Sequence, residues 1–170
     1  MKKIVLFIFV AVFGVMTATA QEVDSLQSDD LSARVDSLSM QLKQLRRDYD
    51  FFYCKYLVEA SSRDVDKFCL DIQLEAERIR VNSYHATWDV DSYIHYKSRI
   101  DNHEETLNLI KQGFELSRSI INLTKLRSNF TDLEKEFLET QLNTVERKCG
   151  VAERYIDAYK LAVELYKQAR

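Results

Sequence analysis

The clearest pattern in the chain is a row of apolar residues at alternating intervals of four and three positions in its N-terminal third. Its eight members are Leu31, Val35, Leu38, Leu42, Leu45, Tyr49, Phe52 and Tyr56. This spacing is typical of the a and d positions of a coiled-coil heptad and puts every member on one face of a helix. The next two positions of the repeat are Glu59 and Arg63, so the pattern predicts a first helix over residues 24–60.

A turn is expected where this repeat stops. Ser61 and Ser62 stand there, and Asp64 follows Ser61 by three positions, a spacing typical of a helix N-terminus. We therefore expect a helix–helix turn near residues 60–63 and a second, shorter helix over 62–86. The apolar face of that helix consists of Val65, Phe68, Cys69, Ile72, Ala76 and Ile79.

Two more helices are expected, over residues 90–127 and 131–169. The first carries a row that runs Tyr93, Tyr96, Ile100, His103, Leu107, Ile110, Phe114, Ser117, Ile121 and Thr124. Asp89 or Asp91 is suitably placed to cap it. Thr131 and Glu134 form a capping-box pattern that opens the last helix, whose apolar positions continue from Leu138 to Tyr166.

The class that these patterns predict is all-α. Proline is absent and there are only three glycines, a composition that suits long uninterrupted helices and is poor for a sheet with many turns. Short turns imply antiparallel neighbours. We expect residues 21–170 to form a single domain, an elongated antiparallel bundle of four helices with coiled-coil-like heptad seams. Because the expected helices differ in length, the seam of the first helix is also a candidate for pairing with another molecule.

The N-terminus predicts export. Lys2 and Lys3 precede an apolar run over residues 4–15, and Ala18-Thr19-Ala20 is a small-x-small site ahead of Gln21. This segment resembles Gram-negative export signals. The run becomes polar at Thr17, which makes it shorter than the roughly 20 apolar residues of a membrane span. We expect cleavage near Ala20-Gln21, a periplasmic or secreted location, and no membrane insertion of the mature chain.

The charge of the mature chain argues against polyanionic partners. Removing Lys2 and Lys3 from 24 basic residues leaves 22, against 27 acidic ones. Nucleic acids and anionic lipid surfaces require a concentrated basic patch, which this sequence lacks. A protein partner, or self-association through the helical seams, is therefore expected instead.

The cysteines raise the question of a disulfide, because an exported protein matures in an oxidising compartment. Cys54 and Cys69 lie nearly the same distance from the expected turn, so an antiparallel hairpin would bring them level. A bridge between them is one reading, and free buried thiols are the other. Cys149 falls on the apolar face of the last helix and fits a small buried side chain.

No residue pattern in the sequence indicates catalysis. His95 and His103 are not preceded at three positions by a glutamate, as di-metal helical bundles require, but by Ser92 and Ile100. There is no G-x-S-x-G elbow and too little glycine for a phosphate-binding loop. We predict that the protein is not an enzyme and expect no catalytic residue, metal ligand or cofactor.

Two groups of aromatic residues are candidates for binding a partner. The members that we single out are Phe51, Tyr53, Tyr84, Trp88, Tyr93 and Tyr96. Tyrosine and tryptophan are enriched in protein interfaces when they are exposed. The alternative is that both groups only close the core and its ends.

These observations favour a structural or protein-interaction module of the cell envelope. In general build the chain resembles small exported helical proteins of Gram-negative envelopes. A periplasmic holdase-type chaperone shares this layout, although such chaperones typically present basic surfaces and this chain is acidic. A carrier of a small apolar ligand is the other alternative, and it would need a cavity among small residues such as Ser117, Thr124 and Ala152.

Overall fold

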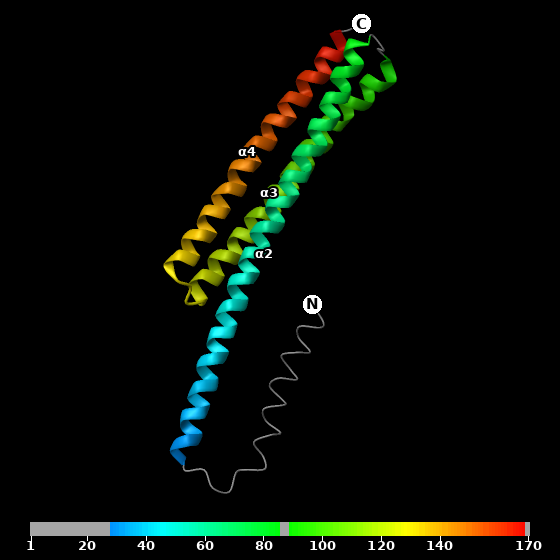
Figure 1. Ribbon diagram of the computed structural model, residues 1–170. Helices are drawn as coiled ribbons and strands as arrows, with labels where there is room; N and C mark the ends of the chain where they lie inside the picture. The colour runs from blue at the N-terminus through cyan, green and yellow to red at the C-terminus, as the bar shows by residue number, and fades with distance from the viewer. Residues whose placement is uncertain (1–27, 86–88, 169–170) are drawn as a thin grey trace. The chain divides into compact units, whose positions relative to one another are not determined.

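The structure, a computed structural model, describes residues 28–85 and 89–168, and these form three helices (Figure 1). They are α2 (Ser28–Tyr84), α3 (Val90–Arg127) and α4 (Asp132–Gln168). The described residues include no strand, so the all-α prediction is confirmed. The expected signal segment, residues 1–20, lies outside the described residues.

The expected number of helices was wrong, because α2 continues through residues 60–63. Ser61 is buried, and its hydroxyl donates to the carbonyl of Leu57, one turn earlier in the same helix, at 3.0 Å. Neither proline nor glycine stands near this point to interrupt the backbone hydrogen bonds. The apolar repeat ends here on one face of α2, but a second apolar row on the other face continues through Val58, Val65 and Ile72. The predicted first and second helices are therefore one.

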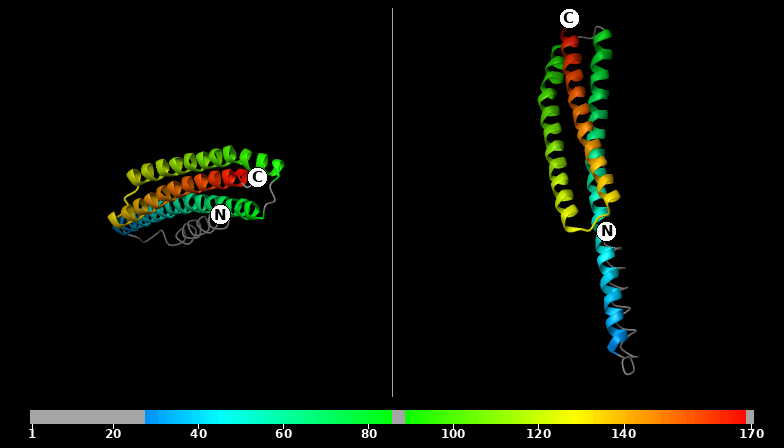
Figure 2. Two further views of the ribbon diagram at one scale, coloured as in Figure 1. Left: turned by 90° about the horizontal axis from the view of Figure 1, so that it is seen from above. Right: turned by 90° about the vertical axis from the view of Figure 1, so that its left-hand side faces the viewer.

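The chain divides into two compact units, residues 1–46 and residues 47–170. In the second unit, the part of α2 from residue 47 packs with α3 and α4 as a three-helix bundle (Figure 2). Contacts between α2 and α3 show that these helices are antiparallel. Arg127 pairs with Asp50 at 3.4 Å, and the amide of Asn82 donates to the hydroxyl of Tyr96 at 3.0 Å.

A ladder of ion pairs fixes the register of α3 against α4. Its rungs recur every seven residues on each helix and are Lys125–Glu139 (2.8 Å), Arg118–Glu146 (2.7 Å), Lys111–Glu153 and Glu104–Lys160 (2.6 Å). The signs of the charges are exchanged in the last rung. Each such surface pair contributes at most about 1 kcal/mol to stability, but a shift by one turn would separate all of them. These ion pairs therefore determine the register of α3 against α4 more than they stabilise the bundle.

The core of the bundle runs along all three helices. Its largest fully buried side chains are Cys54, Val65, Ile72, Ile79, Ile121, Leu138, Leu142, Val145, Tyr159, Val163 and Tyr166. Where the core reaches the Tyr84 end of α2, the ring of Tyr166 meets the ring of Tyr96 edge-on, with centroids 5.5 Å apart. The hydroxyl of Tyr166 accepts a hydrogen bond from the backbone N–H of Asp89 at 3.0 Å. The packed helical bundle is thus confirmed as a three-helix bundle.

Two helix caps agree with the sequence patterns. The N–H of Thr131 donates to the carboxylate of Glu134 at 2.7 Å, and the N–H of Glu134 donates to the hydroxyl of Thr131 at 3.3 Å. This is the reciprocal arrangement of a capping box. The carboxylate of Asp89 accepts from the N–H of Ser92 at 2.9 Å, and that bond lowers the pKa of Asp89.

Candidate functional site

The most unusual surface of the described residues is a row of exposed aliphatic side chains on α2 in the first unit. We call it the α2 stripe, and its members are Leu31, Val35, Leu38, Leu42 and Leu45. Each is between 48 and 61% exposed. A single exposed leucine is common, whereas a contiguous apolar row marks an interaction surface or an aggregation hazard. The residues that flank it, which include Ser32, Arg34, Ser39, Gln41 and Arg46, are polar.

The second unit leaves the rest of the same repeat exposed too. Tyr49, Phe52 and Tyr56 are 68, 66 and 57% exposed. At 100° per residue, these three point away from Cys54 and Val58, which face the core. The ring of Tyr53 stacks on that of Tyr49, with centroids 6.4 Å apart and the planes nearly parallel. The helical repeat that is clearest in the sequence is therefore not the row that the bundle buries.

The structure describes five of the six aromatic residues singled out from the sequence, and they differ in exposure. Phe51 is partly buried against Phe130 and Phe137, with ring centroids 5.8 and 6.1 Å away. Tyr93 and Tyr96 also pack partly against the core. Tyr53 and Tyr84 are exposed, Tyr84 at 80%. Trp88 lies outside the described residues.

The structure does not bring Cys54 and Cys69 together. Both belong to α2 and stand fifteen residues apart, which corresponds to about 22 Å along a helix, whereas a disulfide needs Cα atoms within about 7 Å. Cys54, Cys69 and Cys149 are all free. Burial raises the pKa of each thiol, and at Cys69 the negative charge of Asp66 adds to this effect.

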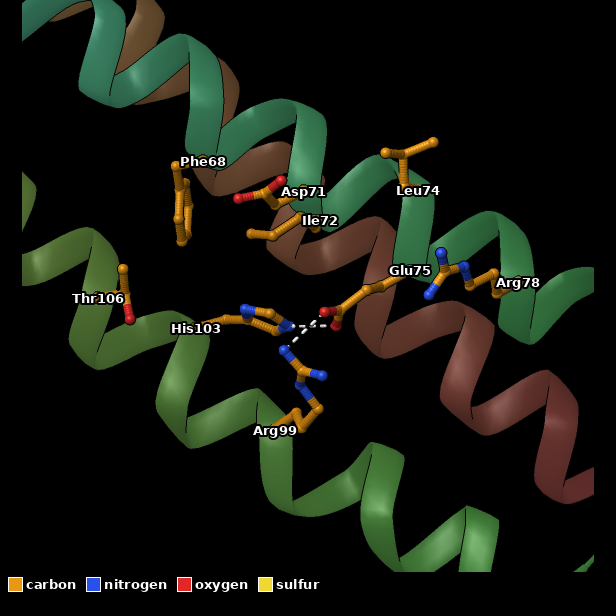
Figure 3. Close-up of a pocket in the computed structure, with 9 residues that line it drawn as sticks. All are labelled: Phe68, Asp71, Ile72, Leu74, Glu75, Arg78, Arg99, His103 and Thr106. Carbon is orange, nitrogen blue, oxygen red and sulfur yellow. Dashed lines mark hydrogen bonds and ion pairs between the residues drawn. The ribbon is translucent and has the colours of Figure 1, made fainter.

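A polar groove of about 320 Å³ lies between α2 and α3, centred on Glu75 (Figure 3). It is lined by Phe68, Asp71, Ile72, Leu74, Glu75, Arg78, Arg99, His103 and Thr106. The carboxylate of Glu75 receives the guanidinium of Arg99 on one oxygen at 2.6 Å and lies 3.1 Å from Nε2 of His103 on the other. Both oxygens thus serve contacts that join α2 to α3.

The ring of His103 is enclosed by aromatic neighbours. It meets Tyr159 edge-on with centroids 4.8 Å apart and Phe68 at 6.3 Å. The hydroxyl of Tyr159 donates to the backbone carbonyl of Tyr96 at 3.2 Å. Burial, together with the negative charge of Glu75, raises the pKa of Tyr159 to about 12. The spacing of the apolar row predicts that His103 lies on the buried face. It does not predict the partner Glu75, because that residue belongs to a different helix and stands 28 positions earlier.

Two further grooves are lined mainly by small and apolar side chains. One, of about 340 Å³ between α2 and α3, is bordered by Ala60, Ser61, Gly113 and Ser117 among others. The other, of about 460 Å³ between α2 and α4, is lined by Arg80, Ser83, Tyr84, Ala158, Leu161, Ala162 and Leu165. Ala152 is fully buried in the core and Thr124 is nearly so, with its hydroxyl bonded to the carbonyl of Ile120. Of the three small residues considered for a ligand cavity, Ser117 lines a groove.

Neither a metal cluster nor a membrane span is found in residues 28–85 and 89–168. No three His, Cys, Asp or Glu side chains of this part lie close enough to share a metal ion. None of its helices combines the length and the apolarity that crossing a membrane requires. The chain matches no protein-family model, no curated protein and no solved structure. The α2 stripe and the grooves are therefore the features from which a function can be inferred.

Proposed function

We propose that this chain is an exported helical-bundle protein of the cell envelope that acts as a structural or protein-interaction module through the α2 stripe. The observation that carries this proposal is the exposure of five large aliphatic side chains in one heptad row. The export signal that the sequence predicts at the N-terminus supports the location, and the excess of acidic residues after the predicted cleavage favours a protein over a polyanion as the partner.

Energetics explain why the α2 stripe should be covered in the working state. Burying an exposed leucine or valine side chain is worth about 1.5–3 kcal/mol, so five half-exposed ones represent a substantial driving force. A partner that covers the α2 stripe would remove these side chains from water.

In-cell photo-crosslinking tests this proposal. A photoreactive amino acid is placed at Leu38 or Leu42 in the α2 stripe, and as matched controls at Ala33 or Met40, which lie on the same helix but outside the row. The protein is expressed in its own cell envelope and illuminated. We expect adducts at the stripe positions only, with the attached protein identified by mass spectrometry. Equal labelling at the stripe and control positions, or no adduct at any position, would contradict the proposal.

A carrier of a small apolar ligand is the second candidate, and the groove between α2 and α4 favours it. Its volume of about 460 Å³ falls within the range of small-molecule sites, and Leu161, Ala162 and Leu165 give it an apolar wall. Native mass spectrometry of the purified protein tests this function directly. A carrier should retain a small molecule that is lost in the variant Ala162→Trp, whereas an empty groove in the wild type would reject it.

A holdase-type chaperone would use the same exposed stripe but would bind unfolded chains without a fixed register. Suppression of the aggregation of an unfolded outer-membrane protein separates it from the first proposal. A specific module should fail in this assay even at several-fold molar excess. Suppression that is lost in the double variant Leu38→Glu/Leu42→Glu would favour the chaperone instead.

A further inference from the structure

We propose that the partner of the α2 stripe is a second copy of this chain, and that the two copies form a parallel, in-register, two-stranded coiled coil over residues 31–56. This inference rests on the proposed function, since it names the partner that the stripe would bind. The observations that carry it are the residue types at the a and d positions, the charges that flank them, and the exposure of the row.

One heptad of the repeat has the combination of residues that favours two strands. In a heptad, the step from d to the next a is four residues. The four-residue intervals of this repeat therefore put Leu31, Leu38, Leu45 and Phe52 at d, and Val35, Leu42, Tyr49 and Tyr56 at a. Leucine at d with a β-branched residue at a favours parallel dimers, and the first full heptad, Val35 with Leu38, has this combination. The repeat spans nearly four heptads, which is the length expected of a stable coiled coil.

The flanking charges decide between the alignments that would bury the whole row. In a parallel, in-register pair, g residues face e residues of the next heptad: Arg34 faces Ser39, Gln41 faces Arg46, and Asp48 faces Tyr53. None of these pairs has like charges. An antiparallel pair that overlaps over the same residues would instead place Arg34 against Lys55 twice. A shifted antiparallel pair would bring Arg34 to Asp48, but it would leave Phe52 and Tyr56 without apolar partners.

The surface that such a pair buries is large enough for a specific dimer. Five aliphatic and three aromatic side chains, each about half exposed, can remove on the order of 600 Å² per copy from water. Two copies then bury about 1,200 Å², which is the lower limit for stable protein interfaces. In the second unit, Tyr49, Phe52 and Tyr56 point away from the core, so the bundle does not cover this part of the row.

Disulfide trapping tests both the identity of the partner and the direction of the helices. Leu31→Cys places a thiol at a d position near the end of the row, where only a parallel, in-register pair brings it against itself. Ala33→Cys is the matched control, because it lies two residues away on the outer face of the helix. Under mild oxidation we expect Leu31→Cys to become a disulfide-linked dimer through residue 31, as shown by peptide mapping, and Ala33→Cys to remain monomeric in denaturing gels.

Two results would overturn this inference. A dimer in which position 31 cross-links only when combined with a cysteine at position 49 or 56 would show an antiparallel pair. A monomer with no cross-link at any stripe position would exclude self-pairing altogether. In that second case the in-cell experiment still decides the proposed function, because a stripe that is labelled by a different protein keeps the interaction module and removes only the second copy.

Discussion

At the scale of single residues, the groove around Glu75 holds polar contacts that join two helices of the bundle. Glu75 joins Arg99 and His103 across two helices, and only about a fifth of its side chain is exposed. Glu77, two positions away, pairs with Arg80 on the surface of α2, and more than half of each side chain is exposed. The two glutamates therefore make a matched comparison of a half-buried and a solvated ion pair.

We expect Glu75→Ala to lower the free energy of unfolding by about 2 kcal/mol, because it leaves Arg99 and the enclosed ring of His103 without their partner. Glu77→Ala should lower it by less than about 0.5 kcal/mol. Urea unfolding followed by circular dichroism measures both. Equal losses for the two variants would show that the Glu75 contacts contribute no more than a surface pair.

Tyr159 gives the bundle a dependence on alkaline pH. Its pKa is about 12 in the folded protein against 10 for an unburied tyrosine, so the unfolded chain releases this proton first as the pH rises. The stability that the buried, protonated Tyr159 contributes is fully present below pH 10. It is lost between pH 10 and 12, and this loss in the free energy of unfolding is about 3 kcal/mol at most. We expect Tyr159→Phe to lose less stability than the wild type over this interval, measured by urea unfolding at each pH. Parallel curves for the two proteins would contradict it.

Residue-level reasoning from the sequence succeeded where the partner is local. The capping box of Thr131 and Glu134 was predicted because both residues stand within one turn. His103 was placed on the buried face by its spacing, and the structure buries it. The partner of His103 could not be predicted, since the pairing of Glu75 with His103 depends on the register of α2 against α3, which no local pattern encodes.

At the scale of elements, the continuity of α2 is the main departure from the sequence prediction. The sequence predicts a turn near residues 60–63 because the apolar repeat stops at Glu59 and because Ser61 and Asp64 have the spacing of a helix N-terminus. The structure shows instead that one helix presents two faces in succession, with Tyr56 at the end of the outer row and Val58 on the buried row. Serine at 61 and 62 is compatible with a helix interior, and Ser61 satisfies its hydroxyl within its own turn.

Proline substitution tests this continuity. Ser62→Pro removes a backbone hydrogen bond from the interior of α2 and should cost 3 kcal/mol or more, on the order expected for an interrupted helix. Ser62→Ala controls for the loss of the contact with Lys148, and Asp132→Pro controls for proline itself, because it stands at the first position of α4, where proline is tolerated. Thermal unfolding measures all three. A harmless Ser62→Pro would restore the predicted turn at residues 60–63.

At the scale of the whole molecule, the proposed pairing leaves the folding of the bundle independent of the association of two copies. The bundle of residues 47–170 has its own core, and the α2 stripe contributes nothing to it. Substitutions in the stripe should therefore change the mass of the assembly and leave the free energy of unfolding of the bundle unchanged. The sequence predicted that its strongest repeat would pair with something. It could not indicate that the bundle closes without this repeat, since that depends on how three helices bury one another.

The most direct test of the stripe as a self-association surface is the absolute mass of the purified protein by sedimentation equilibrium over a range of concentrations. We predict twice the mass of one chain for the wild type and for Met40→Glu, which changes an exposed apolar residue outside the row. The double variant Leu38→Glu/Leu42→Glu should have the mass of one chain while its circular dichroism still shows a folded helical bundle. A wild-type protein that stays monomeric at every concentration, or a double variant that stays dimeric, would contradict this account.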